Sequence, residues 1–391
     1  MTVISKHLEA ILPKIIEIRQ KLHEIPELKF EEFKTAKLIS ETLKSFGYNV
    51  ENGIAKTGLT AILDTGKPGK TIGLRADMDA LPIEEPNNNQ HRSRHPGKMH
   101  ACGHDGHCAT LLAVAYALNQ IKNELSGKVK FIFQPAEEGG KGSTAMIEAG
   151  VLKNPPLDEI YAFHNWPGLP EGIIGVKDGT ILLGNGRIEI SIKGKPAHTA
   201  QPENAVNPVT IGAELITKLE IERLSWSVNS TVLNILSFNS GKLRGMAEKS
   251  EIIAVYYIDT EDNLIELKSF INKYCDQVKD KYKAEIALSF KPFHSPTINT
   301  ANETDKISNA ARMVCGDKKI IKLEKSMIAS EDFSEYLKHI PGCFFLVGAG
   351  ESANPVHTDK FQFNDNVIST AANIICQMVI NSNVKDGISA K

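Results

Sequence analysis

The spacing of apolar residues changes near residue 185 and changes back near residue 296, and this change constrains the fold more than any other feature. Outside these limits, short continuous apolar runs such as Leu59–Leu63 and Ile160–Phe163 alternate with segments of helical periodicity. Continuous apolar runs are typical of strands that are buried on both faces. We therefore predict an α/β domain with a largely parallel sheet and helices on both faces.

Between these limits the strands alternate polar and apolar residues, as in Arg187–Lys193 (RIEISIK), which indicates a sheet with one solvated face. The order of elements there is β-α-β-β-α-β, the ferredoxin-like arrangement. We predict a catalytic domain made of residues 1–184 and 297–391, with a smaller domain of residues 185–296 inserted into it.

Composition excludes several classes of protein. Lys plus Arg number 45 and Asp plus Glu number 47, so no basic excess exists to neutralise nucleic-acid phosphates. No apolar stretch is long enough for a membrane span, and charges interrupt the N-terminal apolar residues, so there is no signal-peptide pattern. Six cysteines in 391 residues are too few for a disulfide scaffold. We expect a cytoplasmic protein that binds neither nucleic acid nor membrane.

Two short segments carry residues suited to metal chemistry. Cys102 and His104 flank Gly103, which allows a sharp backbone turn that can direct both side chains at one ion. A helix is predicted to begin there, and a helix N-terminus favours a thiolate. Glu137 and Glu138 follow an apolar strand, at the sheet edge where open α/β proteins bind ligands. Taken alone, either segment could be a solvated loop.

Two further histidines, His164 and His357, lie at or after predicted strands of the same domain. The five side chains Cys102, His104, Glu138, His164 and His357 offer nitrogen, oxygen and sulfur ligands. Such a set suits zinc, or exchangeable manganese, cobalt or nickel. It could hold two divalent ions with the thiolate between them. Glu137 would then act as a general base toward a water molecule that the metal activates. His198 by itself is more typical of an ordinary loop histidine.

The chain resembles the dinuclear metallopeptidase family of aminoacylases and glutamate carboxypeptidases, and within it the amidohydrolase branch of hippurate hydrolases, N-acyl-L-amino acid amidohydrolases and auxin-conjugate hydrolases. The matching motifs occur in the family's order along nearly the whole chain. They are Leu74–Pro82 (LRADMDALP), His91–His107, Gln134–Gly140 (QPAEEGG), Ala162–His164, Gly194–Pro208, Ser330–Phe333 (SEDF) and Asn354–His357.

The resemblance implies that Cys102, His104, Glu138, His164 and His357 are metal ligands, with Cys102 bridging, and that Glu137 is the base. It implies that His198 stabilises the oxyanion of the tetrahedral intermediate, in many members within the partner subunit's site. It also implies that Asp77 and Asp79 support the ligands, that the inserted domain serves as lid and dimerisation domain, and that the protein is a homodimer or a higher homo-oligomer.

One departure from the family pattern concerns the inserted domain. Relatives usually carry an Asn-x-Ile-Pro segment there, followed by an arginine about a strand later. This chain has Arg244–Ala247 (RGMA) instead, with Tyr257 near the expected arginine position. Arg244 and Asn207 are the residues of this domain that we expect to contact the substrate.

The expected function is metal-dependent hydrolysis of the amide bond of N-acyl amino acids, either hippurate-like or N-acetylated. Two alternatives remain open from the sequence. One is a dipeptidase or carboxypeptidase that uses the same site. The other is a catalytically silent metal-binding homologue, which the departure in the inserted domain suggests.

Overall fold

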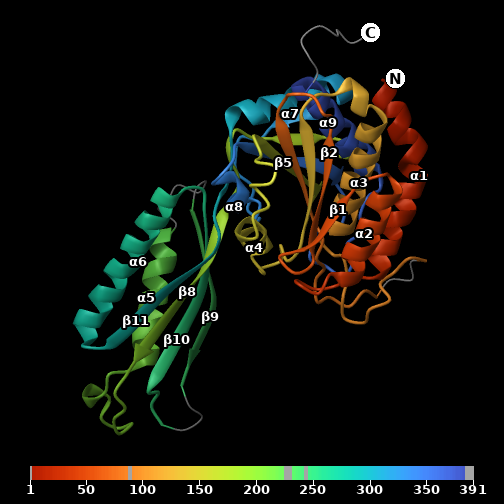
Figure 1. Cartoon of the computed structure of the whole chain (residues 1–391). Helices are drawn as coiled ribbons and strands as arrows, with labels where there is room; N and C mark the ends of the chain where they lie inside the picture. Colours follow the sequence, from red (N-terminus) through yellow and green to blue (C-terminus); the bar gives the residue numbers. More distant parts are fainter. Residues whose placement is uncertain (1, 87–89, 224–230, 242–244, 384–391) are drawn as a thin grey trace. The chain divides into compact units, whose positions relative to one another are not determined.

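The computed structural model describes residues 2–86, 90–223, 231–241 and 245–383 (Figure 1). The chain divides into two compact units. The first comprises Met1–Ile181, Ile298–Glu324 and Asp332–Lys391, and the second comprises Leu182–Thr297 and Lys325–Glu331. Lys325–Glu331 was predicted to lie in the catalytic domain, and this placement is wrong. The segment joins the second unit because Met327 pairs with Leu182 and accepts a hydrogen bond from the Leu183 amide at 3.2 Å.

The first unit is built on an eight-stranded sheet in the order β1-β2-β4-β3-β5-β14-β6-β13, and its central strands β4, β3, β5 and β14 are parallel. All seven residues of β3 are buried, which requires cover on both faces of the sheet. Figure 1 shows α3 on one side of this sheet and α4 on the other. The strands are β1 (Val50–Ile54), β2 (Gly58–Asp64), β3 (Thr71–Asp77), β4 (Lys128–Gln134), β5 (Glu159–Pro167), β6 (Ile174–Val176), β13 (Ile320–Lys322) and β14 (Gly342–Gly350).

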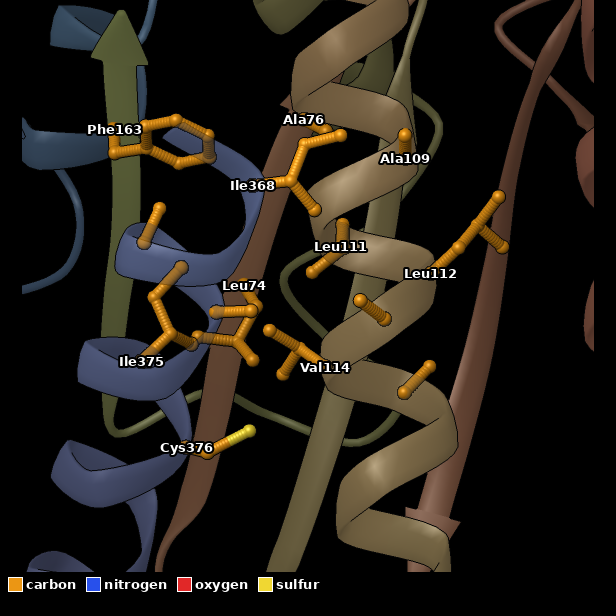
Figure 2. Close-up of a cluster of buried hydrophobic side chains, with 14 of the residues drawn as sticks. Leu74, Ala76, Ala109, Leu111, Leu112, Val114, Phe163, Ile368, Ile375 and Cys376 are labelled. Carbon is orange, nitrogen blue, oxygen red and sulfur yellow. The ribbon is translucent and has the colours of Figure 1, made fainter. Parts of the chain in front are cut away.

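Helices α1, α2, α3, α7 and α9 of the first unit share one buried apolar cluster with this sheet. Figure 2 shows Val114 of α3 and Ile375 of α9 directed toward Leu74 of β3, so two helices distant in sequence pack on one strand. Burial of such side chains stabilises the unit by about 1.5–3 kcal/mol each. The helices are α1 (Val3–Glu24), α2 (Phe33–Ser45), α3 (His104–Gln120), α4 (Gly142–Glu148), α7 (Ala301–Cys315), α8 (Ser334–Leu337) and α9 (Asn366–Asn383).

The second unit has the predicted β-α-β-β-α-β order and an antiparallel sheet, β11-β8-β10-β9. Strand β8 alternates buried and half-buried residues along its length, so one face of the sheet packs inward. Helices α5 and α6 cover that face and form a separate apolar core. The elements are β8 (Gly184–Lys193), α5 (Pro208–Arg223), β9 (Thr231–Ser240), β10 (Lys249–Ile258), α6 (Glu261–Tyr282) and β11 (Glu285–His294).

Two short strands, β7 (Gly179–Leu182) and β12 (Thr297–Asn299), pair where the chain passes from one unit to the other. Among the described residues, no helix combines the length and the apolar character needed to cross a membrane.

Candidate metal centre

The candidate site lies at the carboxyl ends of the central parallel strands. Asp77 ends β3, Gln134 ends β4 just before Glu137 and Glu138, and His357 follows β14 in the chain. His164 was predicted to lie at the end of its strand but lies within β5, which extends to Pro167. Carboxyl ends of adjacent parallel strands meet at one sheet edge, so these side chains converge although they are far apart in sequence.

The turn at Gly103 directs Cys102 and His104 into the site. Gly103 has a φ of +100° and is the N-cap of α3. A Cβ atom at this position would lie 2.4 Å from Oδ1 of Asn165, so no larger residue fits. The predicted glycine turn and helix start are therefore both present. His357 reaches the same place because its backbone amide donates to the Ala101 carbonyl at 2.8 Å.

The ligand atoms of the predicted residues lie close together. Cys102, His104 and His164 form one group in which these atoms are all within 4.8 Å of one another. Cys102, Glu138 and His357 form a second group under the same limit. Sγ of Cys102 is 3.3 Å from Nε2 of His164, and Oε1 of Glu138 is 3.1 Å from Nε2 of His357. Cys102 belongs to both groups, which is the arrangement that a shared thiolate requires.

The hydrogen bonds of the two buried histidines fit metal binding. Nδ1 of His104 donates to the Asp79 carbonyl at 2.8 Å, and Nδ1 of His164 donates to the Asn165 carbonyl at 2.6 Å. Metal-binding histidines usually donate their second ring N–H to a carbonyl or carboxylate in this way. Nε2 of His104 is buried and makes no hydrogen bond within the described part of the chain. A buried nitrogen without a hydrogen bond is costly unless a ligand occupies it, so the donor set fits a divalent ion.

His107, one turn further along α3, differs in this respect. Its Nδ1 lies 2.7 Å from Oδ1 of Asp77, and its Nε2 lies 2.7 Å from Oδ1 of Asn165. Both ring nitrogens are therefore engaged by protein groups. His107 is suited to holding Asp77 in place rather than to binding an ion.

Protons compete with a metal ion for these ligands. Burial raises the pKa of the Cys102 thiol, which opposes the stabilisation expected from the helix N-terminus. Hydrogen bonds to Cys102 and Glu138 raise the pKa of His357 to about 10. Burial tends to lower the pKa of His104, but the negative charge of Asp77 and interactions with Cys102 and Asp79 outweigh burial and hold that pKa well above its usual value. Binding of a metal ion would release these protons.

Comparison with known proteins gives the family of the chain. Residues 73–381 match the family described as peptidase family M20/M25/M40. The chain belongs to this family. The predicted resemblance, including its hippurate hydrolase branch, is confirmed.

Three M20 relatives show how far the similarity extends. The chain is 32% identical over 381 residues to a hippurate hydrolase of Campylobacter jejuni, covering 95% of this chain and 98% of that protein. It is 32% identical over 373 residues to thermostable carboxypeptidase 1 of Saccharolobus solfataricus, covering 92% of each. A solved Bacillus subtilis structure, described as a dinuclear metal binding peptidase from the M20 family, has a TM-score of 0.85. It is 29% identical and covers 95% of this chain and 98% of that one.

A buried ionic network that the sequence did not predict lies beside the candidate ligands of this M20 chain. The guanidinium of Arg75 donates to Asp77 at 2.7 Å and to Asp332 at 2.9 Å. Asp332 also accepts from the Ser143 amide at 2.9 Å and from Nε2 of Gln134 at 2.8 Å. Arg75 and Asp332 lie in the matched motifs LRADMDALP and SEDF, but a motif alone does not indicate that they form an ion pair.

Of the site residues predicted in the inserted domain, the structure describes His198 and Asn207 but not Arg244. His198 is exposed on the second unit, where Nδ1 accepts from the Ala200 amide at 3.2 Å. Oδ1 of Asn207 accepts from the Val209 amide at 3.0 Å, which is the geometry of an N-cap for α5. That cap gives Asn207 a structural role. Arg244 lies outside the described residues.

Proposed function

We propose that this M20 protein is a metal-dependent amidohydrolase that cleaves the amide bond of N-acyl amino acids. The observation that carries the proposal is the cluster of Cys, His and Glu ligand atoms, in which Cys102, His104 and His164 are buried and to which Glu137 belongs. His104, Glu137 and Glu138 form a further group whose ligand atoms lie within 4.8 Å of one another. The similarity to a hippurate hydrolase supports the acyl amino acid as substrate class, since hippurate is N-benzoylglycine.

The cofactor of this proposal is a pair of divalent ions, of zinc, manganese, cobalt or nickel. Cys102, His104, Glu138, His164 and His357 would hold them. When bound, divalent ions in such a site lower the pKa of a water molecule and polarise the carbonyl group of a substrate.

The protein's own residues supply the proton transfer. Glu137 is the base in this proposal, and its side chain is mostly buried beside the ligand cluster. Its carboxylate would take a proton from the attacking water and later give that proton to the leaving nitrogen of the amide. His198, carried on the second unit, would donate a hydrogen bond to the oxyanion. Glu138 would remain a ligand, because adjacent side chains of one segment point in different directions.

The alternative within the family is a carboxypeptidase or dipeptidase. It is favoured by one specific observation, the similarity to thermostable carboxypeptidase 1 over 92% of the chain. The same ligands and the same base would serve either reaction, so the substrate decides between them.

The deciding experiment measures hydrolysis of three substrates by protein reconstituted separately with zinc, manganese, cobalt or nickel. N-benzoylglycine tests the amidohydrolase, N-benzoylglycylleucine tests the carboxypeptidase by release of leucine, and glycylleucine tests the dipeptidase. We expect N-benzoylglycine or its N-acetyl analogues to be cleaved with kcat/KM of about 10⁴ M⁻¹s⁻¹ or more. Cleavage of the peptide substrates alone would contradict the proposal. Two bound metal equivalents without any cleavage would indicate the silent homologue.

A further inference from the structure

The turn that carries Glu137 and Glu138 has an unusual backbone. Ala136 has a φ of +56° and Lys141 a φ of +58°, in the left-handed region that residues with a Cβ atom rarely adopt. This conformation is unfavourable because it brings the Cβ atom close to the following carbonyl oxygen. The turn is also tight, because a Cβ atom on Gly142 would lie 1.6 Å from the Pro135 carbonyl oxygen. Contacts from outside the turn must therefore hold it in this form.

Two buried carboxylates bind three successive amides of this turn. Glu32 accepts from the Ala136 amide through Oε1 at 2.9 Å. Asp79 accepts from the Glu137 amide at 3.0 Å and from the Glu138 amide at 2.9 Å. The sequence already pointed to Asp79 as a supporting residue. Glu32, which lies between α1 and α2 and is 104 residues from Ala136, had no predicted role.

The Glu32 side chain is itself held in one place. It is fully buried, and Oε1 accepts a second hydrogen bond, from the Phe30 amide at 2.9 Å. Oε2 accepts from the Thr57 hydroxyl at 2.5 Å. These three donors are two amides and a hydroxyl, so none of them carries a charge. Burial raises the pKa of Glu32, which is consistent with a carboxyl group that works through hydrogen bonds rather than through its charge.

We propose that Glu32 is a positioning residue, which fixes Glu137 at the reacting atoms by accepting the Ala136 N–H. The part of this proposal that concerns catalysis rests on the proposed function of Glu137. The turn requires only an acceptor oxygen at this position, so a glutamine in place of Glu32 should preserve the turn. Its amide oxygen can accept from the Ala136 and Phe30 amides, while its NH₂ group donates to the Thr57 hydroxyl. Methionine has a similar shape and offers no comparable acceptor.

The experiment compares Glu32→Gln and Glu32→Met, with Glu303→Met as the matched control. Glu303 is also a buried carboxylate that accepts from a threonine hydroxyl, that of Thr300, but it lies in the first turn of α7. Hydrogen exchange is measured by mass spectrometry on the peptide that covers residues 134–140, in protein stripped of metal. Thermal unfolding, kcat and KM are measured on the same variants after loading with metal.

We expect Glu32→Met to speed exchange of this peptide about tenfold, the equivalent of one lost hydrogen bond of about 1.4 kcal/mol. It should lower kcat by about 10–100-fold while KM changes less than about threefold. Glu32→Gln should stay within about threefold of the native protein in both measurements. Glu303→Met should lower the unfolding temperature and leave both measurements at native values. Thr57→Val, which removes the hydroxyl that donates to Oε2 and changes no residue of the turn, should shift exchange and kcat in the direction of Glu32→Met.

Three results would overturn the proposal. The first is native exchange and native kcat in Glu32→Met, or in Thr57→Val if the methionine variant does not fold. The second is faster exchange with an unchanged kcat, which would make Glu32 purely structural. The third is a loss in Glu32→Gln as large as in Glu32→Met, which would mean that the charge acts. The exchange measurement needs neither metal nor substrate. If the native protein has no turnover, the proposed function is contradicted, but the exchange measurement still tests whether Glu32 holds the turn through the Ala136 amide.

Discussion

At the scale of single residues, hydrogen-bond partners separate a histidine suited to metal binding from a structural one. His104 and His107 lie on adjacent turns of α3, and both are buried. One ring nitrogen of His104 has no hydrogen bond within the described residues, whereas both ring nitrogens of His107 lie 2.7 Å from a partner oxygen. Residue type and spacing do not distinguish the two, because the partners Asp77 and Asn165 come from other strands.

This difference predicts unequal effects on metal content. His104→Ala should lose at least one equivalent of bound metal, because it removes a candidate ligand. His107→Gln should keep the native stoichiometry and weaken affinity by about 10–100-fold, as is typical for groups that orient ligands. Elemental analysis gives the stoichiometry and competition with a chelator gives the affinity. Full metal content in His104→Ala would remove His104 from the ligand set.

At the scale of elements, a buried ionic cluster joins α1 to α3. His23 of α1 lies 2.9 Å from Oδ2 of Asp105 in α3 and 3.4 Å from Glu85. Arg19 also binds Asp105, at 3.0 Å. Burial tends to lower the pKa of His23, but the charges and hydrogen bonds of Asp105 and Glu85 outweigh it and raise the pKa to about 9. The other charged or titratable side chains around this cluster are His91, His100 and Asp365.

The His23 cluster predicts a dependence of stability on pH. His23 has a pKa of about 9 in the folded protein and about 6.5 in the unfolded chain, so protonated His23 stabilises the fold fully below pH 6.5. This stabilisation is lost as the pH rises through about 9. The difference between the two pKa values corresponds to about 3 kcal/mol of folding free energy. Urea denaturation should show His23→Gln less stable than the native protein by about 2–3 kcal/mol at pH 6, with a smaller gap at pH 10. His7→Gln, on the same helix, is the control. A gap that is the same at both pH values would contradict the assignment.

Most elements are predictable from the sequence because their apolar periodicity is strong. The β-α-β-β-α-β order of the second unit, for example, follows from strands such as β8 with one buried face. Strand β1 was missed because VENGI has no apolar alternation and its central residues are exposed. The segment Lys325–Glu331 was misplaced because its pairing partner, Leu182, is far away in sequence.

The candidate site can be predicted from the sequence only in part. Residues that offer candidate ligand atoms stand out by type and spacing, as Cys102 and His104 do. Residues that act through a hydrogen bond to a distant segment do not, because nothing near Glu32 or Arg75 in sequence indicates their partners. The contact of Arg75 with Gln134, for example, depends on the strand order, which brings β3 beside β4.

At the scale of the whole molecule, two units with separate apolar cores share one chain. Glu137 lies in the first unit and His198 in the second. We propose that the protein is a homodimer or a higher homo-oligomer in which His198 acts within the partner subunit's site.

If His198 acts within the partner subunit's site, two inactive variants should restore activity to each other in a mixed dimer. Glu137→Gln and His198→Ala should each have low activity as homodimers. A mixed dimer contains one site with both native residues, so refolding an equal mixture should recover about a quarter of native activity, given statistical assortment and one such site in half of the dimers. Mixed dimers can be verified by differential tagging before the assay. Verified mixed dimers without any recovered activity would contradict the arrangement.

The central claim is that Glu137 is the base of a metal-dependent amidohydrolase, and one pair of adjacent variants tests it most directly. Metal content and turnover of N-benzoylglycine or its N-acetyl analogues are measured for Glu137→Gln and Glu138→Gln beside the native protein. We predict that Glu137→Gln keeps the native metal content and loses turnover by about 10²–10⁴-fold or more, whereas Glu138→Gln loses metal together with activity. Near-native turnover in Glu137→Gln with full metal content would contradict the account.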